Sequence, residues 1–241
     1  MANAERTWVL LHGSPGDSTS WDPLRAHAPA GVSLEAWDLL DHGRAADAPS
    51  ATLDDVVADV VGRVEALGRP VTLVGHSFGS WVAARACAAL GERVSRFVSI
   101  AGLAGITEEI AARSMGFAAA LESGGLSLAA AADAAVDLWL PTVGRNPDDV
   151  ARLRAMITAD RVERLVRILR RQCGLADSSL HVRSLRVPTV GVGCRDDRGI
   201  SLALGRELAE MAAIPTFIEL DGDSHFPHWT HTAQVAALVF A

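Results

Sequence analysis

The chain has 241 residues, of which 49% are hydrophobic and 21% are charged. This composition excludes a disordered chain and fits one large α/β domain, because such folds often exceed about 200 residues undivided. The formal net charge of -7 argues against nucleic acid as a partner and gives no attraction to an anionic membrane.

The cysteines and the apolar runs indicate the compartment. Cys87, Cys173 and Cys194 lie far apart, and their odd number argues against a disulfide framework or a zinc site. The first apolar run, residues 8–11, is too short for a signal-peptide core, and no run reaches the length of a membrane span. We therefore expect a cytoplasmic protein that uses no metal and no organic cofactor.

Short apolar runs alternate with helical patterns in the first half of the chain, which is typical of a parallel sheet covered by helices on both faces. The predicted strands are residues 8–11, 33–37, 71–74, 97–100, 189–192 and 216–220. After the second strand, valines recur at helical spacing behind the predicted N-cap Thr52, and Gly68 ends the pattern. The alanine-rich residues 81–90 predict a helix that ends at Gly91.

The stretch from about residue 105 to residue 181 breaks this alternation. Its pattern is almost wholly helical and offers no good strand. We interpret it as a helical cap inserted into a core of residues 1–104 and 182–241. Core and cap together form a single predicted domain over residues 1–241.

Two features stand out within the predicted cap. Residues 129–140 predict a helix that Pro141 stops, and apolar residues at helical spacing from Val150 to Leu169 mark one or two more. The opposite side of the last pattern carries four arginines: Arg161, Arg164, Arg167 and Arg171. Because such a stripe is usually solvated, we expect these side chains to face solvent, with steering of an anionic substrate as a secondary role.

The strongest chemical signal is residues 75–79, Gly-His-Ser-Phe-Gly, between the third predicted strand and the alanine-rich helix. In this G-x-S-x-G pattern, a tight strand-to-helix turn exposes the serine hydroxyl, and the flanking glycines remove side chains that would collide there. The helix start supplies amides and the positive end of a dipole for an oxyanion. The pattern predicts Ser77 as a nucleophile.

A serine hydroxyl is a poor nucleophile at neutral pH, so Ser77 needs a base and an acid that orients the base. In this kind of site the chain order is Ser, acid, His. His225 follows the last predicted strand, where a loop can carry its imidazole over Ser77. Asp196 and Asp197 both follow the preceding strand, and they compete for the role of the acid.

Three histidines, His225, His228 and His231, recur every three residues and suggest a metal site. We reject a metal site because Pro227 interrupts the segment where a shared helical face would be needed. We expect His228 and His231 to be exposed.

The segment after the first strand, residues 12–17, is the candidate for the other half of an oxyanion hole. Its glycines let backbone amides approach a ligand, although a plain Gly-Pro turn would have the same composition. We predict that the amides of Ser14 and Phe78 form the hole, and that His12 is structural.

Together these motifs resemble the α/β-hydrolase superfamily over nearly the whole chain. Residues 12–16 resemble its oxyanion loop, and residues 224–227 resemble its catalytic-histidine loop. Residues 38–44 resemble its D-x-x-G-H-G-x segment, with Asp41 at a usual glycine. The resemblance implies a mostly parallel sheet of about six strands under a helical cap. Because only eleven residues precede His12, the first two strands of the usual sheet are expected to be missing or shortened.

The resemblance also ranks the two aspartates. In the family pattern, Val-Pro-Thr leads through a strand into a Gly-x-x-Asp turn. Laid without a gap from Val187, this pattern puts Cys194 at the glycine and Asp197 at the acid. Asp196 fits only if Gly193 is the motif glycine and one residue is inserted after it. Asp197 is therefore the favoured acid.

The resemblance implies a serine esterase or lactonase that acts on a small-molecule substrate. Residues 137–141 and 148–154 of the cap are similar to 3-oxoadipate enol-lactonases. Two alternatives stay open. The same Ser-His-Asp set serves as a proton shuttle in a cofactor-free lyase, such as a hydroxynitrile lyase or another eliminating enzyme. A binding module could retain the pocket without turnover, but it has no physical need for an intact triad.

Overall fold

A six-stranded sheet forms the centre of the computed structural model, which describes residues 6–49, 51–175 and 185–241. The strands are β1 (Arg6–Leu11), β2 (Val32–Trp37), β3 (Val71–His76), β4 (Val94–Ile100), β5 (Thr189–Cys194) and β6 (Thr216–Leu220). Their order in the sheet is β2-β1-β3-β4-β5-β6, and every neighbouring pair is parallel. The predicted α/β class and the six predicted strands are confirmed.

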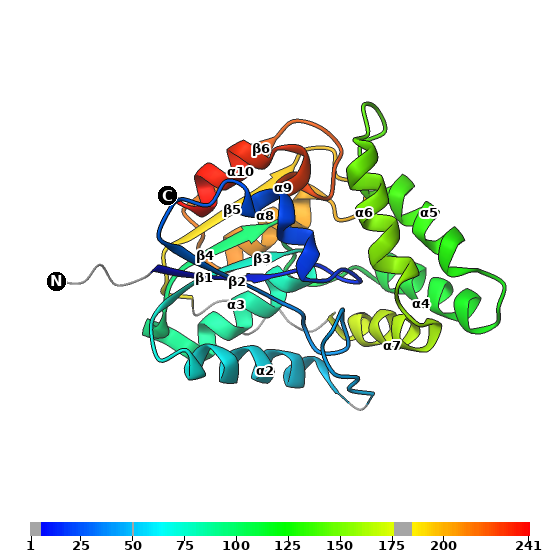
Figure 1. The fold of residues 1–241 in the computed structure, drawn as a ribbon, viewed down its shortest axis with the longest axis horizontal. Coiled ribbons are helices and arrows are strands. Elements are labelled where there is room, and N and C mark those ends of the chain that lie inside the picture. Colours follow the sequence, from blue (N-terminus) through cyan, green and yellow to red (C-terminus); the bar gives the residue numbers. More distant parts are fainter. Residues whose placement is uncertain (1–5, 50, 176–184) are drawn as a thin grey trace.

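Helices cover both faces of the sheet (Figure 1). On one face, α2 (Leu53–Ala66), α3 (Phe78–Leu90) and α8 (Leu202–Met211) pack in one apolar cluster with β1, β3 and β4. On the other face lie η1 (Ser18–Trp21), α1 (Asp22–Arg25) and α10 (Thr232–Val239). Two short helices complete the core: η2 (Gly91–Arg93) lies between α3 and β4 in the chain, and α9 (Pro227–Thr230) lies between β6 and α10. Every residue of the central strand β3 is buried, because helices cover the sheet on both faces.

The start of α2 follows the predicted local signal. Thr52 accepts a hydrogen bond from the Asp55 amide at 3.2 Å, and the Asp55 carboxylate accepts one from the Thr52 amide at 2.7 Å. This reciprocal capping box satisfies two amides that have no partner within the helix. The predicted N-cap is confirmed.

Four further helices stand together beside the sheet, between β4 and β5 in the chain (Figure 1). They are α4 (Glu108–Glu122), α5 (Leu128–Trp139), α6 (Pro147–Thr158) and α7 (Val162–Gln172). The predicted helix 129–140 corresponds to α5, and the pattern from Val150 to Leu169 divides into α6 and α7. We call α4–α7 the cap. Its predicted end at about residue 181 and the core boundary at residue 182 lie outside the described residues.

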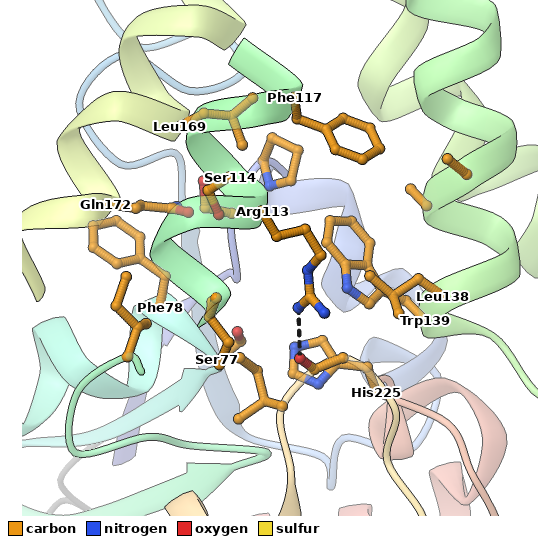
Figure 2. A pocket seen from close by; sticks show the side chains of 18 of the residues that line it. Ser77, Phe78, Arg113, Ser114, Phe117, Leu138, Trp139, Leu169, Gln172 and His225 are labelled. Atoms are coloured by element: carbon orange, nitrogen blue, oxygen red, sulfur yellow. Dashed lines mark hydrogen bonds between the residues drawn. The ribbon is translucent and has the colours of Figure 1, made fainter. Parts of the chain in front are cut away.

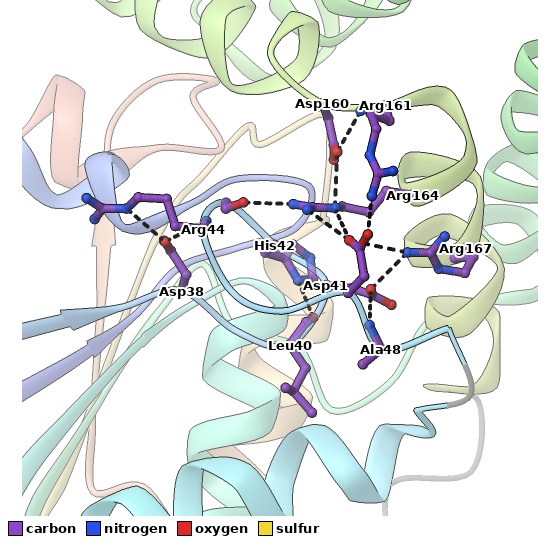
Figure 3. Close-up of polar contacts among 12 residues, drawn as sticks. Asp38, Leu40, Asp41, His42, Arg44, Ala48, Asp160, Arg161, Arg164 and Arg167 are labelled. Carbon is purple, nitrogen blue, oxygen red and sulfur yellow. Dashed lines mark hydrogen bonds and ion pairs between the residues drawn. The ribbon is translucent and has the colours of Figure 1, made fainter.

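Three of the four arginines in the predicted stripe do not face solvent as expected, because the side chains of Arg164, Arg167 and Arg171 are only 15%, 26% and 8% exposed. Arg161, directly before α7, is 62% exposed and agrees with the prediction. Arg167 and Arg171 form ion pairs with Asp41, and Arg161 and Arg164 pair with Asp47. Figure 3 shows Arg164 and Arg167 pointing from α7 toward the loop that follows β2. Only 8% of the Arg171 side chain and none of the Asp41 side chain are exposed. The stripe therefore attaches the cap to the core.

The backbone conformation of Asp41 explains why the family's D-x-x-G-H-G-x segment usually has glycine at this position. Its φ of 66° lies in the left-handed region, which glycine adopts freely and aspartate tolerates better than most residues. In this chain the position also carries a carboxylate that binds the cap. Burial alone would raise the pKa of Asp41, but hydrogen bonds from Arg167, the Ala48 amide and Arg171 outweigh it and lower the pKa to about 2.

Candidate active site

Ser77 occupies a sharp turn between β3 and α3. Its φ of 49° and ψ of -118° are strained for a residue with a side chain, and its amide donates to the Ile100 carbonyl at 2.9 Å. A Cβ on Gly75 would collide with the backbone of Ser80, and one on Gly79 would collide with the Leu11 carbonyl. Only glycine fits at these two positions, so the predicted reason for the glycines holds in the structure.

His225 and Asp197 form a buried pair next to this turn. His225 Nδ1 lies 2.7 Å from Asp197 Oδ2, and both side chains are at most 5% exposed. The other carboxylate oxygen, Oδ1, accepts from the amides of Gly199 at 2.8 Å and Ile200 at 3.1 Å. Because a carboxylate only accepts, His225 Nδ1 carries the proton and donates it. Asp196 is exposed, so the geometry favours Asp197 as the residue that orients His225.

The backbone of His225 is held from two sides. Its amide donates to the Trp139 carbonyl at the end of α5 at 2.8 Å. Its carbonyl accepts from Nε2 of His76 at 2.8 Å. Burial lowers the pKa of His76 well below its ordinary value, so the ring is neutral with its proton on Nε2. Sequence reasoning missed both contacts, because Trp139 and His76 are far from His225 in the chain.

Ser77 and His225 line the same pocket. Within the described part of the chain, no hydrogen bond joins Ser77 Oγ to the His225 ring. Such bonds are often long in the absence of substrate and shorten when it binds. Asp197, His225 and Ser77 are nevertheless the three residues that the sequence predicted for one site.

His228 is buried, so the prediction that it is exposed is wrong. Its side chain packs between Trp21 and His76, at ring-centroid distances of 4.7 and 4.5 Å. Its Nε2 lies 3.1 Å from Ser20 Oγ, and burial lowers its pKa to about 3. His231 is half-buried. The spacing of these histidines could not reveal that Pro227 starts the short helix α9, which turns His228 into the core.

Ser14 and Phe78, whose amides are the predicted oxyanion donors, both line the pocket. Phe78 is the first residue of α3, where an amide has no partner within the helix. On the other side, Ser14 Oγ is 2.9 Å from His42 Nε2. His42 Nδ1 donates to the Leu40 carbonyl at 2.9 Å, so Nε2 accepts the Ser14 hydroxyl proton. This bond fixes the loop that carries the Ser14 amide.

Buried histidines support that loop. Burial lowers the pKa of His42 to about 3 and lowers the pKa of His12 as well, so both rings are neutral. His12 Nε2 accepts from the Leu39 amide at 3.1 Å, and its Nδ1 donates to the Gly13 carbonyl at 2.8 Å. His12 has the structural position that we expected.

The pocket above Ser77 has a cavity volume of about 130 Å³. Its walls are mostly apolar and come from the cap (Figure 2). They include Ile110 and Phe117 of α4, Leu138 and Trp139 of α5, and Leu165 and Leu169 of α7. Ser77 and His225 lie at its base, so a ligand in the pocket would contact the cap and the reacting groups together.

Fold and site define a hydrolase-type α/β protein with a serine at a strand-to-helix turn and a buried His-Asp pair beside it. Residues 8–238 match the model of the alpha/beta hydrolase family. The chain belongs to this family. Among the described residues, no helix is long and apolar enough to cross a membrane.

Similar proteins carry esterase, lipase and lactonase names. A segment of 91 residues is 36% identical to lipase LipV of Mycobacterium tuberculosis, covering 37% of this chain and 34% of the lipase. The chain thus spans about a third of that relative.

Two solved structures share the fold at low sequence identity. A thermophilic esterase from Thermogutta terrifontis, with malate bound, superposes with a TM-score of 0.84 at 20% identity, covering 97% of this chain and 88% of the esterase. An enol-lactonase from Burkholderia xenovorans LB400 superposes with a TM-score of 0.84 at 23% identity, covering 97% of this chain and 89% of the lactonase.

Proposed function

We propose that the protein is a serine hydrolase that cleaves a small carboxylic ester or lactone through an acyl-enzyme on Ser77. One observation carries this proposal. His225, which is 2.7 Å from Asp197 through its Nδ1, lines the same pocket as Ser77, which is held at a strained turn. The esterase, lipase and enol-lactonase names among the similar proteins agree with this chemistry.

In the proposed reaction, Ser77 Oγ attacks the carbonyl carbon while His225 Nε2 takes its proton. Asp197 keeps the His225 proton on Nδ1 and stabilises the imidazolium. The amides of Ser14 and Phe78 donate to the oxyanion. His225 then protonates the leaving oxygen, which departs as the alcohol. A water molecule, deprotonated by His225, attacks the acyl-enzyme, and His225 returns the proton to Ser77 Oγ as the acid is released.

The pocket dimensions favour a small substrate. A cavity of about 130 Å³ holds a molecule of roughly the size of benzene. The cap carbonyl of Trp139 holds His225, and the core carries Ser77, so both parts are needed for one site. This joint construction supports our proposal that residues 1–241 act as a single domain.

The first test is Ser77→Ala, measured by steady-state hydrolysis of p-nitrophenyl acetate and by thermal unfolding. We expect activity to fall by roughly three orders of magnitude or more, with little change in the melting temperature. Retention of more than about a tenth of the activity would exclude Ser77 as the nucleophile.

A substrate panel tests the reaction class. We expect short esters and small lactones to be turned over faster than long-chain esters, because the pocket is small. Activity confined to cyanohydrin cleavage or another elimination would favour the lyase. Absence of any turnover would favour the binding module.

A further inference from the structure

One arginine of the cap differs from all the others. Nine arginines lie between residues 105 and 175. Eight of them form ion pairs with Asp or Glu: Arg145, Arg152, Arg154, Arg161, Arg164, Arg167, Arg170 and Arg171. Arg113 on α4 has no carboxylate partner among the described residues. It is also the one cap arginine that lines the pocket above Ser77.

The guanidinium of Arg113 lies close to the reacting groups. Figure 2 shows it pointing from α4 across the pocket toward His225. Its Nη2 donates to the Gly199 carbonyl at 3.3 Å. Gly199 is itself beside the imidazole, because a Cβ on this glycine would lie 3.3 Å from His225 Cγ. The positive charge therefore lies near His225, on the same side of the pocket.

The surroundings of Arg113 are those of an anion site. None of the described residues that line the pocket is acidic, and most are apolar. A guanidinium has five N–H donors, and the Gly199 carbonyl uses one. The planar fork of the guanidinium matches the two oxygens of a carboxylate.

We propose that Arg113 binds a carboxylate of the substrate, so that the enzyme selects esters or lactones that carry an anionic group a few atoms from the scissile carbonyl. This inference rests on the proposed ester hydrolysis. It adds a specificity-determining residue and a substrate class to it. The carboxylate belongs either to the acid part or to the alcohol part of the ester, and the experiment below tests each part separately.

The test compares esters that differ in charge and match in length. For the acid part, the pair is 4-nitrophenyl hydrogen succinate and 4-nitrophenyl butyrate. For the alcohol part, the pair is O-butyryl glycolate and propyl butyrate, followed by pH-stat titration. Each pair is measured with the wild type, Arg113→Gln and the control Arg170→Gln. Arg170 pairs with Glu122 on the exposed side of the cap and does not line the pocket.

In at least one pair we expect the wild type to prefer the anionic ester. Arg113→Gln should lower kcat/KM for that ester by about 10-fold, mainly through KM. We expect no larger loss, because Arg113 is exposed and water screens its attraction to the carboxylate. The neutral ester should change by less than about twofold, and higher ionic strength should reduce the wild-type preference. Arg170→Gln should leave both rates unchanged. Two results would overturn the proposal. The first is an unchanged charge preference in Arg113→Gln. The second is an equal loss of activity on both esters of a pair, which would mean that Arg113 only supports the loop that contains Gly199.

A binding measurement separates this inference from the proposed function. Calorimetry with monomethyl succinate in the Ser77→Ala background should give affinity that Arg113→Gln removes, with methyl butyrate as the neutral reference. If the wild type hydrolyses none of the esters, the acyl-enzyme proposal fails. The calorimetric comparison still decides whether Arg113 binds a carboxylate, and equal affinity with and without Arg113 refutes it.

Discussion

Asp41→Asn tests the attachment of the cap to the core. Asparagine keeps the shape of the side chain and tolerates the left-handed backbone of Asp41, so the substitution mainly removes the charge. The pKa of about 2, set against the ordinary value of 3.8, corresponds to roughly 2 kcal/mol of stability that the ionised group contributes. This contribution is fully present above the unfolded pKa and is lost only as the pH falls from 3.8 to about 2.

The substitution also leaves Arg171 buried without its anion. Breaking a buried pair typically costs about 3–5 kcal/mol, so we expect Asp41→Asn to lower the free energy of unfolding by ~2–4 kcal/mol. In a chain of this length the melting temperature should fall by about 5–12 °C. Because α7 lines the pocket through Leu165 and Leu169, KM should rise as well.

The assay is thermal unfolding and steady-state kinetics at about pH 7.5, where the full effect is present. Asp47→Asn is the matched control, because Asp47 pairs with the same helix but is 40% exposed. Its effect on the melting temperature should be clearly smaller. Equal shifts in the two variants, or a shift below about 2 °C for Asp41→Asn, would refute the reasoning that the buried pair holds the cap.

Three further predictions concern the site and the buried histidines. Asp197→Asn should lower turnover roughly a thousandfold or more, and Asp196→Asn should lower it less than about tenfold. If steady-state kinetics gave the reverse ranking, Asp196 would be the acid. His76→Phe removes the donor that holds the His225 carbonyl at 2.8 Å, so kcat should fall by about 10-fold to 100-fold, and an unchanged kcat would show that the loop holds itself. Burial lowers the pKa of His42 and His228 to about 3, so below pH ~6.5 the unfolded chain binds more protons and stability is lost as the pH falls toward 3. Each ring should cost about 2 kcal/mol at about pH 5, and urea unfolding that gave equal stability at about pH 7.5 and about pH 5 would contradict the burial argument.

Features that depend on neighbouring residues could be derived from the sequence. The capping box at Thr52, the strand before Gly75 and the helix after Ser77 each follow from the residues beside them. The apolar runs of the buried strands gave the six-stranded sheet, and the turn at Ser77 gave the place of the nucleophile. The existence and type of these elements depend on short-range geometry, which the order of residues specifies directly.

The tertiary structure decided how distant residues pair. Asp196 and Asp197 have nearly the same sequence surroundings, and only the folded loop turns one of them to His225 and the other to solvent. The α7 arginines have the pattern of a solvated face until the loop with Asp41 packs against them. Arg113 has no local mark that separates it from the other arginines of the cap. The pairing of a charge depends on which elements meet in space, and these contacts join positions that lie tens of residues apart in the chain, or more than a hundred for Asp41 and Arg171.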